Sequence, residues 1–271
     1  MNSQTFIRTV SAAVAALIFA SVGYFFKVPG IVGLISVVTL IGCFELGRLL
    51  FSQSAKSNFQ PLGLLLIYCT YMVNSFFPYF GNLPMAVSGL FFLGYVLFHA
   101  HRFSDLSQLY DLAGRFLLGL IYLGLLPAYG VRLLMLNNGL KWFFCLLAVV
   151  FAGDILAYFV GRAVGKTKLM PLISPKKTVE GAIGGLVGSI VCAGLTATLF
   201  ENSDPITFGI MGAAVGGAAQ VGDLFESSLK RIANMKDSGT IMPGHGGVLD
   251  RVDGVLFAAP LVYAFANFMA F

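Results

Sequence analysis

Residues 140–163 read LKWFFCLLAVVFAGDILAYFVGRA, and this stretch decides the fold class. An apolar run of roughly 20 residues is long enough to cross the hydrocarbon core of a bilayer, about 30 Å thick, as an α-helix. A helix satisfies its own backbone hydrogen bonds, which lipid cannot do. The stretch therefore predicts a transmembrane helix.

The whole chain shares this apolar character. Of its 271 residues, 58% are hydrophobic and 11% are charged, whereas a soluble protein carries about 25% charged residues. A transmembrane β-barrel would show alternating segments of about 10 residues, and the apolar runs here do not alternate. We therefore expect an all-α polytopic integral membrane protein.

Hydropathy and helix-breaking residues together predict nine membrane spans. They are Ile7 to Phe26, Val28 to Phe51, Pro61 to Phe80, Leu83 to His99, Leu112 to Leu136, Leu140 to Ala163, Gly181 to Phe200, Pro205 to Phe225, and Val252 to Phe271. With nine spans, all lysines and arginines except Lys27, Arg132 and Lys141 fall on one side. The positive-inside rule then predicts a cytoplasmic N-terminus and an external C-terminus.

No connection between these spans is long enough for a soluble domain, so we expect one integrated membrane domain. Only Glu45, Asp105 and Asp111 of the twelve acidic residues precede position 150. Residues 1–140 are therefore expected to be a transmembrane scaffold, and residues 141–271 a transmembrane catalytic region.

Three other features favour structural roles. The opening apolar stretch has no convincing cleavage site, so we expect a retained span. Glu45 and Arg48 are three residues apart and are interpreted as a helix ion pair. Cys43, Cys69, Cys145 and Cys192 lie in apolar runs without metal-ligand spacing and are expected to be buried free thiols.

The densest polar stretch lies between the last two predicted spans. Its residues are Ser227, the pair Lys230-Arg231, the pair Lys236-Asp237, the turn PGHGG at 243–247, and Asp250-Arg251-Val252-Asp253. Asp250 and Asp253 are three residues apart at a helix start and share one face. With Asp223 they form a set of hard oxygen ligands that suits magnesium. Ion pairing with the neighbouring Lys230, Arg231 and Arg251 is the structural alternative.

The order and spacing of these residues resemble the signature of the phosphatidate cytidylyltransferases, also called CDP-diacylglycerol synthases. Two further blocks are similar to that family: Asp154 with Tyr158 and Gly161-Arg162, and the stretch from Ser174 to Gly181. The resemblance is strongest from about Asp154 to Asp253. It implies nine helices around a polar cavity that faces the cytoplasm.

The resemblance also implies a reaction of phospholipid biosynthesis in the bacterial cytoplasmic membrane. CTP and phosphatidic acid would give CDP-diacylglycerol and pyrophosphate. Magnesium would be the cofactor, with manganese as an alternative and an additional monovalent cation left open. The implied catalytic residues are Asp223, Ser227, Lys230, Arg231, His245, Asp250, Arg251 and Asp253, and Asp223, Asp250 and Asp253 among them would hold the metal.

A second set of residues is expected to bind substrate. They are Asp154, Ser174, Lys176, Lys177 and Thr178. Ser174 before Pro175 is typical of a helix N-cap followed by proline at the first helical position, which would direct free amides to an anion. His245 lies in a glycine-rich turn that can approach a phosphate, and a positioning role is favoured over that of a general base.

The expected partners are CTP, phosphatidic acid and membrane lipids, with no nucleic acid and with a homodimer left open. Two other functions stay open on the residues alone. A CTP-dependent polyprenol or phytol kinase would release CDP instead of pyrophosphate. An ion-coupled transporter would use Asp154 and Asp223 as intramembrane ligands.

Overall fold

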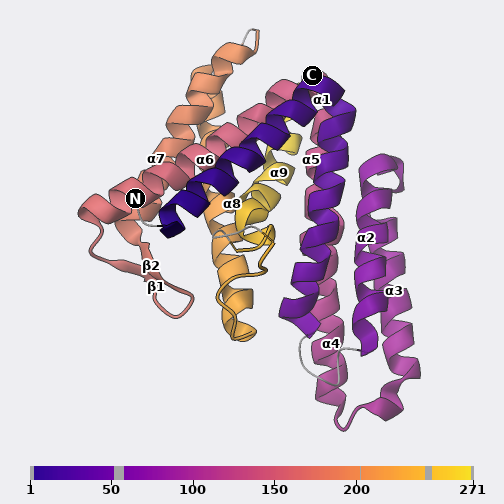
Figure 1. Ribbon diagram of the computed structural model, residues 1–271. Coiled ribbons are helices and arrows are strands. Elements are labelled where there is room, and N and C mark those ends of the chain that lie inside the picture. Colours follow the sequence, from indigo (N-terminus) through magenta and orange to yellow (C-terminus); the bar gives the residue numbers. More distant parts are fainter. Residues whose placement is uncertain (1–2, 52–57, 202, 242–245, 270–271) are drawn as a thin grey trace. The chain divides into compact units, whose positions relative to one another are not determined.

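The computed structural model describes residues 3–51, 58–201, 203–241 and 246–269 (Figure 1). The chain forms helices and one short two-stranded sheet. It divides into two compact units, each built from two pieces of sequence. The first is Met1–Arg132 with Ile232–Arg251, and the second is Leu133–Arg231 with Val252–Phe271.

The first unit contains the N-terminal helices. They are α1 (Ser3–Phe51), α2 (Gln60–Phe76), η2 (Pro78–Phe80), α3 (Leu83–Phe98), η3 (Ala100–Arg102), α4 (Leu106–Gly119), the π-helical η4 (Leu120–Leu125) and α5 (Leu126–Leu134), whose last two residues belong to the second unit. The carboxylate of Asp105 caps α4 by accepting a hydrogen bond from the amide of Ser107 at 3.2 Å. A hydrogen bond from the hydroxyl of Ser107, together with the one from its amide, lowers the pKa of Asp105 below its ordinary value.

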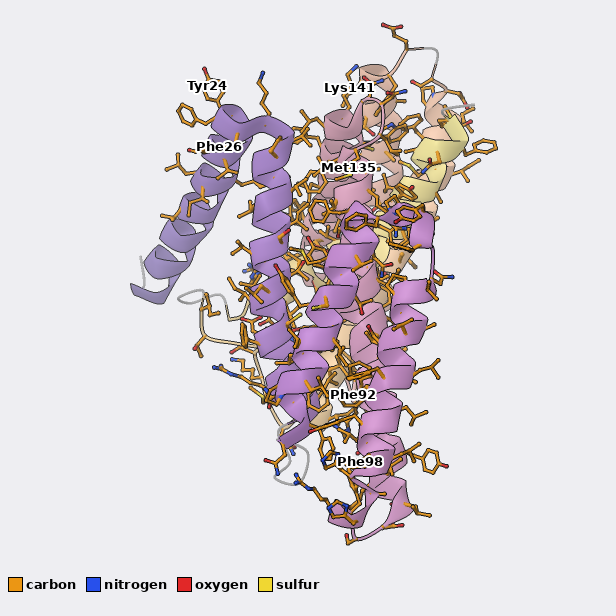
Figure 2. The ribbon with its side chains drawn as sticks, turned by 90° about the vertical axis from the view of Figure 1, so that its right-hand side faces the viewer. Tyr24, Phe26, Phe92, Phe98, Met135 and Lys141 are labelled. Carbon is orange, nitrogen blue, oxygen red and sulfur yellow. The ribbon has the colours of Figure 1, made fainter. Side chains whose placement is uncertain are left out.

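Helix α1 is two helices that meet at a bend, which Figure 2 shows near Tyr24 and Phe26. Lys27 there has φ 50° and ψ −137°, and Pro29 follows inside the helix. Proline lacks the amide hydrogen that an α-helix needs and crowds the preceding turn. The rings of Tyr24 and Phe26 are exposed, which suits side chains that face lipid.

Buried aromatic and polar contacts hold the first unit together. Phe92 of α3 stacks on Phe116 of α4 with ring centroids 3.8 Å apart, and Figure 2 labels Phe92 among the packed helices. Asn74 of α2 donates a hydrogen bond to the carbonyl of Gly124 at 3.1 Å. Gly124 belongs to the π-helical turn, where backbone carbonyls depart from the regular α-helical ladder.

The second unit contains the C-terminal helices and the sheet. Its elements are α6 (Gly139–Val164), β1 (Lys168–Met170), β2 (Ser174–Thr178), α7 (Val179–Thr196), η5 (Ala197–Leu199), α8 (Pro205–Ile232) and α9 (Leu249–Met269). The last residue of α8 and the first three of α9 belong to the first unit. Strands β1 and β2 are antiparallel, with Lys168 opposite Thr178 and Met170 opposite Ser174.

Glycines bring the helices of the second unit into backbone contact. A Cβ on Gly185 of α7 would lie 2.9 Å from the carbonyl oxygen of Gly153 on α6, and one on Gly216 of α8 would lie 2.5 Å from the Ser189 side chain of α7. In a bilayer the attraction between helices comes from close packing, which small residues permit. Glycine is therefore required at these crossings.

The prediction of nine spans was wrong in number. Six helices in the described residues are long and apolar enough to cross a membrane, which makes the chain a multi-pass membrane protein. The first two predicted spans form the single bent α1, and the third and fourth correspond to α2 and α3, of 17 and 16 residues. The expected cavity enclosed by nine helices is replaced by a pocket within the second unit.

Two smaller predictions also need correction. Ser174 is no helix N-cap, because residues 174–178 form β2 and the helix begins at Val179, where the hydroxyl of Thr178 accepts a hydrogen bond from the amide of Gly181 at 3.1 Å. All four cysteines are free, as expected, but Cys69 is exposed and Cys192 is half-buried.

Candidate active site

A pocket of about 550 Å³ lies within the second unit. It is bounded by α6, the hairpin of β1 and β2, the start of α7, and α8. Its polar lining residues are Asp154, Tyr158, Arg162, Lys176, Lys177, Thr178, Gln220 and Asp223. The structure therefore brings Asp154, Asp223 and three residues of β2 to one cavity.

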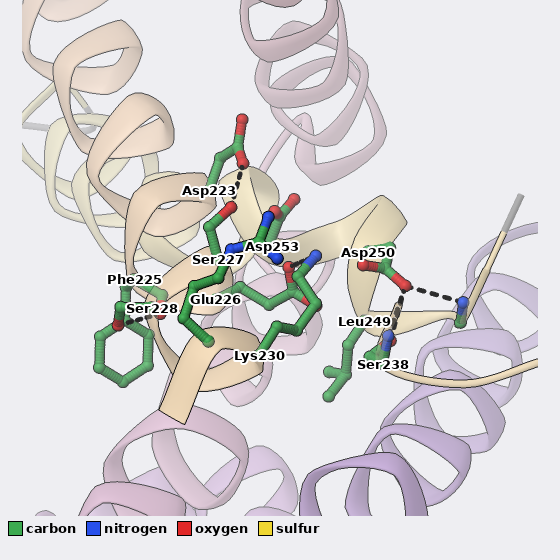
Figure 3. A network of polar contacts seen from close by, with 12 residues as sticks. Asp223, Phe225, Glu226, Ser227, Ser228, Lys230, Ser238, Leu249, Asp250 and Asp253 are labelled. Carbon is green, nitrogen blue, oxygen red and sulfur yellow. Dashed lines mark hydrogen bonds and ion pairs between the residues drawn. The ribbon is translucent and has the colours of Figure 1, made fainter. Parts of the chain in front are cut away.

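Lys177 and Asp223 join the two sides of this pocket. The ammonium of Lys177 on β2 lies 2.5 Å from the carboxylate of Asp223 on α8, and both side chains are partly exposed. The same carboxylate accepts a hydrogen bond from the hydroxyl of Ser227, one turn further along α8, at 3.4 Å (Figure 3). The pocket wall thus carries one positively and one negatively charged side chain, which can bind an anionic or a cationic ligand.

The hairpin carries the lysines to this position. Lys176 and Lys177 are adjacent on β2, and Lys177 is half-buried while Lys176 is exposed. The guanidinium of Arg231, near the end of α8, donates a hydrogen bond to the carbonyl of Ile173 at 3.1 Å. This bond fastens the turn of the hairpin to α8, so Arg231 supports the site from outside the pocket lining.

A buried ion pair lies next to Asp223 on α8. Glu226 is fully buried, and its carboxylate pairs with the ammonium of Lys230 one turn later, as Figure 3 shows. Removing one partner of a buried pair leaves an uncompensated charge, which is strongly unfavourable. Glu226 therefore fixes the position of Lys230.

Helices α8 and α9 touch beside Asp223. A Cβ on Gly222 would lie 2.5 Å from the carbonyl oxygen of Asp253. The side chain of Asp253 accepts a hydrogen bond from the amide of Gly254 at 2.8 Å. Because Gly222 and Asp223 are neighbours, this crossing brings Asp223 and Asp253 to the same part of the second unit.

Asp250 belongs to the first unit. Its Oδ2 atom accepts hydrogen bonds from the amide of Ser238 at 2.9 Å, the hydroxyl of Ser238 at 2.8 Å and the amide of Gly247 at 2.8 Å. Figure 3 shows Ser238 and Asp250 facing each other. These bonds fix the orientation of the carboxylate at the start of α9.

Comparison with known proteins now decides the family. Residues 6–269 match the cytidylyltransferase family. The chain belongs to the cytidylyltransferase family. It is 34% identical over 265 residues to phosphatidate cytidylyltransferase of Bacillus subtilis (strain 168), covering 94% of this chain and 95% of that protein.

Two other relatives carry the same name. The phosphatidate cytidylyltransferase of Synechocystis sp. is 33% identical over 294 residues, covering 95% of both chains. That of Brucella abortus biovar 1 is 46% identical over 125 residues, which cover 46% of both chains. This cytidylyltransferase therefore resembles two of these relatives over nearly its full length.

The donor set of the second unit fits a divalent cation, which nucleotidyltransferases commonly use. Asp154, Asp223 and Asp253 are hard oxygen donors, and Asp253 interacts electrostatically with the other two. No three histidine, cysteine, aspartate or glutamate side chains converge on an ion site within the described part of the chain. Magnesium is usually held by one or two carboxylates, completed by waters and substrate phosphates. The carboxylates present in this cytidylyltransferase suit that mode of binding.

The remaining predicted site residues take other places. Arg251 is exposed at the first turn of α9, and Ser174 is half-buried at the start of β2 without lining the pocket. His245 lies outside the described residues. Its expected role is therefore still a prediction.

Sequence reasoning did not single out Glu226, the buried partner of Lys230. A signal was present, since Glu226 precedes Lys230 by four residues, the spacing of a helix ion pair. Arg162 was noted only as part of a block similar to the family, and Gln220 was not among the predicted site residues, although both line the pocket. Gln220 donates a hydrogen bond to the carbonyl of Ala182 on α7 at 2.9 Å, a contact that no local pattern could indicate.

Proposed function

We propose that this chain transfers the cytidylyl group of CTP to phosphatidic acid and releases pyrophosphate and CDP-diacylglycerol. The supporting observation is the pocket that joins Lys176, Lys177 and Asp223, in a chain that matches proteins named phosphatidate cytidylyltransferase over almost its whole length. A polyanionic nucleotide requires cations, and a cation-binding carboxylate beside them matches metal-assisted nucleotidyl transfer.

The reaction would be an in-line displacement at phosphorus. A phosphate oxygen of phosphatidic acid forms a bond to the α-phosphorus of CTP, and the bond from that phosphorus to the bridging oxygen of the β-phosphate breaks. The electron pair leaves with pyrophosphate. Such transfers depend on positioning and charge stabilisation more than on covalent help from the protein.

Two groups of basic residues would bind the phosphates of the substrates in this proposal. Lys176 and Lys177 would bind phosphates in the pocket, and Lys230, Arg231 and Arg251 would bind phosphates at the ends of α8 and α9. Ser227 and His245 would position reacting groups, and Asp154 would contact substrate. Asp223, Asp250 and Asp253 would hold magnesium, which would neutralise charge on the phosphates when bound.

The site would face the cytoplasm of a bacterial cell, since the relatives are bacterial and CTP is a cytoplasmic nucleotide. Four lysines lie close together between α6 and α7, and the positive-inside rule favours the cytoplasm for such a cluster. They are Lys166, Lys168, Lys176 and Lys177. Residues 1–140 would serve as scaffold, and residues 141–271 would carry the catalytic groups.

The test is product analysis with purified protein in detergent, CTP, phosphatidic acid and magnesium. We expect equal amounts of pyrophosphate and CDP-diacylglycerol. Asp250→Asn should reduce the rate at least a hundredfold, because it changes a carboxylate proposed to hold the metal. The control is Asp111→Asn, which changes a partly exposed ion pair with Arg115 in the first unit and should keep the wild-type rate.

Other products would overturn the proposal. CDP together with a phosphorylated lipid alcohol would indicate a CTP-dependent lipid kinase. Ion flux in vesicles without CTP would indicate a transporter. An Asp250→Asn variant with the wild-type rate would remove Asp250 from the catalytic set.

A further inference from the structure

Glu45 is a buried carboxylate in the scaffold half of the chain, and it contacts residues just before and at the start of α9. It lies near the end of α1 and is 2% exposed. Its two oxygens accept hydrogen bonds from the amides of Val248 at 3.0 Å and Leu249 at 2.9 Å, and from the hydroxyl of Ser238 at 3.2 Å. The expected ion pair with Arg48 is thus replaced by contacts to residues about 200 positions away, all within the first unit.

Ser238 links Glu45 to Asp250. Its hydroxyl lies 3.2 Å from Oε2 of Glu45 and 2.8 Å from Oδ2 of Asp250. A serine hydroxyl has only one hydrogen to donate, so the two carboxylates share it. Ser238 is itself fully buried. A change at Glu45 therefore acts on Asp250 through one intervening side chain.

Two glycines make room for this network. A Cβ on Gly239 would lie 2.2 Å from Oε1 of Glu45, and one on Gly247 would lie 2.6 Å from Oε2 of Glu45. Both distances are far below van der Waals contact. Gly239 and Gly247 therefore pack directly against the carboxylate of Glu45.

The start of α9 requires hydrogen-bond acceptors at this place. The first amides of a helix lack intrahelical acceptors and carry partial positive charge. A buried carboxylate is costly unless it accepts several hydrogen bonds. Glu45 accepts two from backbone amides and shares the hydroxyl of Ser238 with Asp250. Helix α7 takes its cap from the adjacent Thr178, whereas α9 takes acceptors from α1. This long-range cap holds Ser238 as well as the first amides of α9.

We propose that Glu45 is a positioning residue for the transfer reaction: by capping α9 and holding Ser238, it sets the position of Asp250. The inference rests on the proposed function, and it adds a residue of the scaffold region to the machinery. Glu45 acts through other residues and needs no contact with substrate.

The first measurement is hydrogen–deuterium exchange of the purified protein without substrate, read by mass spectrometry over residues 236–252. In Glu45→Gln one carboxylate oxygen is replaced by a hydrogen-bond donor, which opposes donors at the same place. We expect exchange in this segment to be at least tenfold faster than in wild type. Peptides from α6 and α7 should exchange at wild-type rates.

The second measurement is steady-state kinetics of the same variant. We expect kcat to fall at least tenfold and the KM for CTP to change by less than about threefold. Glu45→Asp, which keeps the charge on a shorter side chain, should recover part of kcat, and Ser238→Ala should reproduce part of the loss. The control is Thr39→Val, a buried change on α1 whose hydroxyl bonds to the carbonyl of Ile35 at 2.8 Å and to the hydroxyl of Tyr71, and to no residue of the Glu45 network in the described contacts.

Several outcomes would overturn the inference. If Glu45→Gln folds, the inference fails when residues 236–252 exchange at the wild-type rate or when kcat is unchanged. It also fails when exchange becomes faster in all helices alike. If Glu45→Gln does not fold, Ser238→Ala takes its place, and wild-type exchange and kcat in that variant would overturn the inference. Hydrogen–deuterium exchange does not require catalytic turnover. If the wild-type protein has no activity, the proposed function is refuted, but the exchange data still test whether Glu45 holds residues 236–252.

Discussion

At the scale of single residues, the acids near the signature are held by two kinds of partner, lysine side chains and hydrogen-bond donors of the loop before α9. Asp223 pairs with Lys177, Glu226 with Lys230, and Asp250 with backbone amides and Ser238. The second pairing can be predicted from sequence because its members are four residues apart on one helix. The first cannot, since a strand and a distant helix must meet before the two charges are close.

The Lys177–Asp223 pair leads to a prediction about substrate binding. Lys177→Gln should lower kcat/KM for CTP about tenfold or more, because a charged hydrogen bond to phosphate contributes about 1.5–3 kcal/mol. The loss of a partly exposed ion pair contributes little to stability, so the unfolding temperature should change by no more than a few degrees. Kinetics and a thermal unfolding curve in detergent check both.

The matched control for Lys177 is Lys168→Gln. Lys168 lies on β1 of the same hairpin, is exposed, and does not line the pocket. It should keep the wild-type kcat/KM. Equal losses in the two variants would mean that the hairpin acts only through its net charge.

At the scale of elements, the long apolar helices were the most predictable part of the structure. The predicted span Leu140 to Ala163 corresponds to α6 (Gly139–Val164), and the span that begins at Pro205 corresponds to α8. The β hairpin could not be predicted, because its strands have three and five residues and no apolar alternation. Their pairing depends on the turn between them and on α8.

Helix packing in the second unit gives a prediction about stability. Gly185→Ala should lower the unfolding temperature by several degrees, because its Cβ would lie 2.9 Å from both the Ala157 side chain and the carbonyl of Gly153. Overpacking of this kind costs about 1–3 kcal/mol. Thermal unfolding followed by Trp142 fluorescence measures the change.

The control for this substitution is Gly217→Ala on α8. A Cβ at Gly217 meets nothing within 4 Å, and alanine favours helix over glycine. The variant should therefore be as stable as wild type or slightly more stable. Comparable destabilisation in both variants would argue against close packing as the cause.

At the scale of the whole molecule, the predicted family and membrane class are confirmed by the comparisons and the helices. The number of spans was overestimated because the break at Lys27 was interpreted as the end of a span, although it is a bend inside α1, and because the short helices α2 and α3 were counted as spans. The metal ligands and the roles of single basic residues are still predictions. They depend on substrates, which a sequence pattern cannot place.

The topology of the second unit can be tested across α7. This helix separates the hairpin from Glu201, so the two should lie on opposite sides of the membrane. In a protein without its natural cysteines, Lys168→Cys should react with an impermeant thiol reagent in inside-out vesicles. Glu201→Cys should react only in right-side-out vesicles. Labelling of both from one side would contradict a membrane-spanning α7.

The contact between Glu45 and α9 also has a consequence for biosynthesis. Glu45 and Leu249 are 204 positions apart, so a ribosome completes most of the chain before the carboxylate meets the amides it caps. Contacts between distant residues form late, because loop closure must come first. A truncated or stalled chain would insert its early helices yet leave the signature segment unformed. The cap on α9 would thus exist only in chains translated nearly to the end.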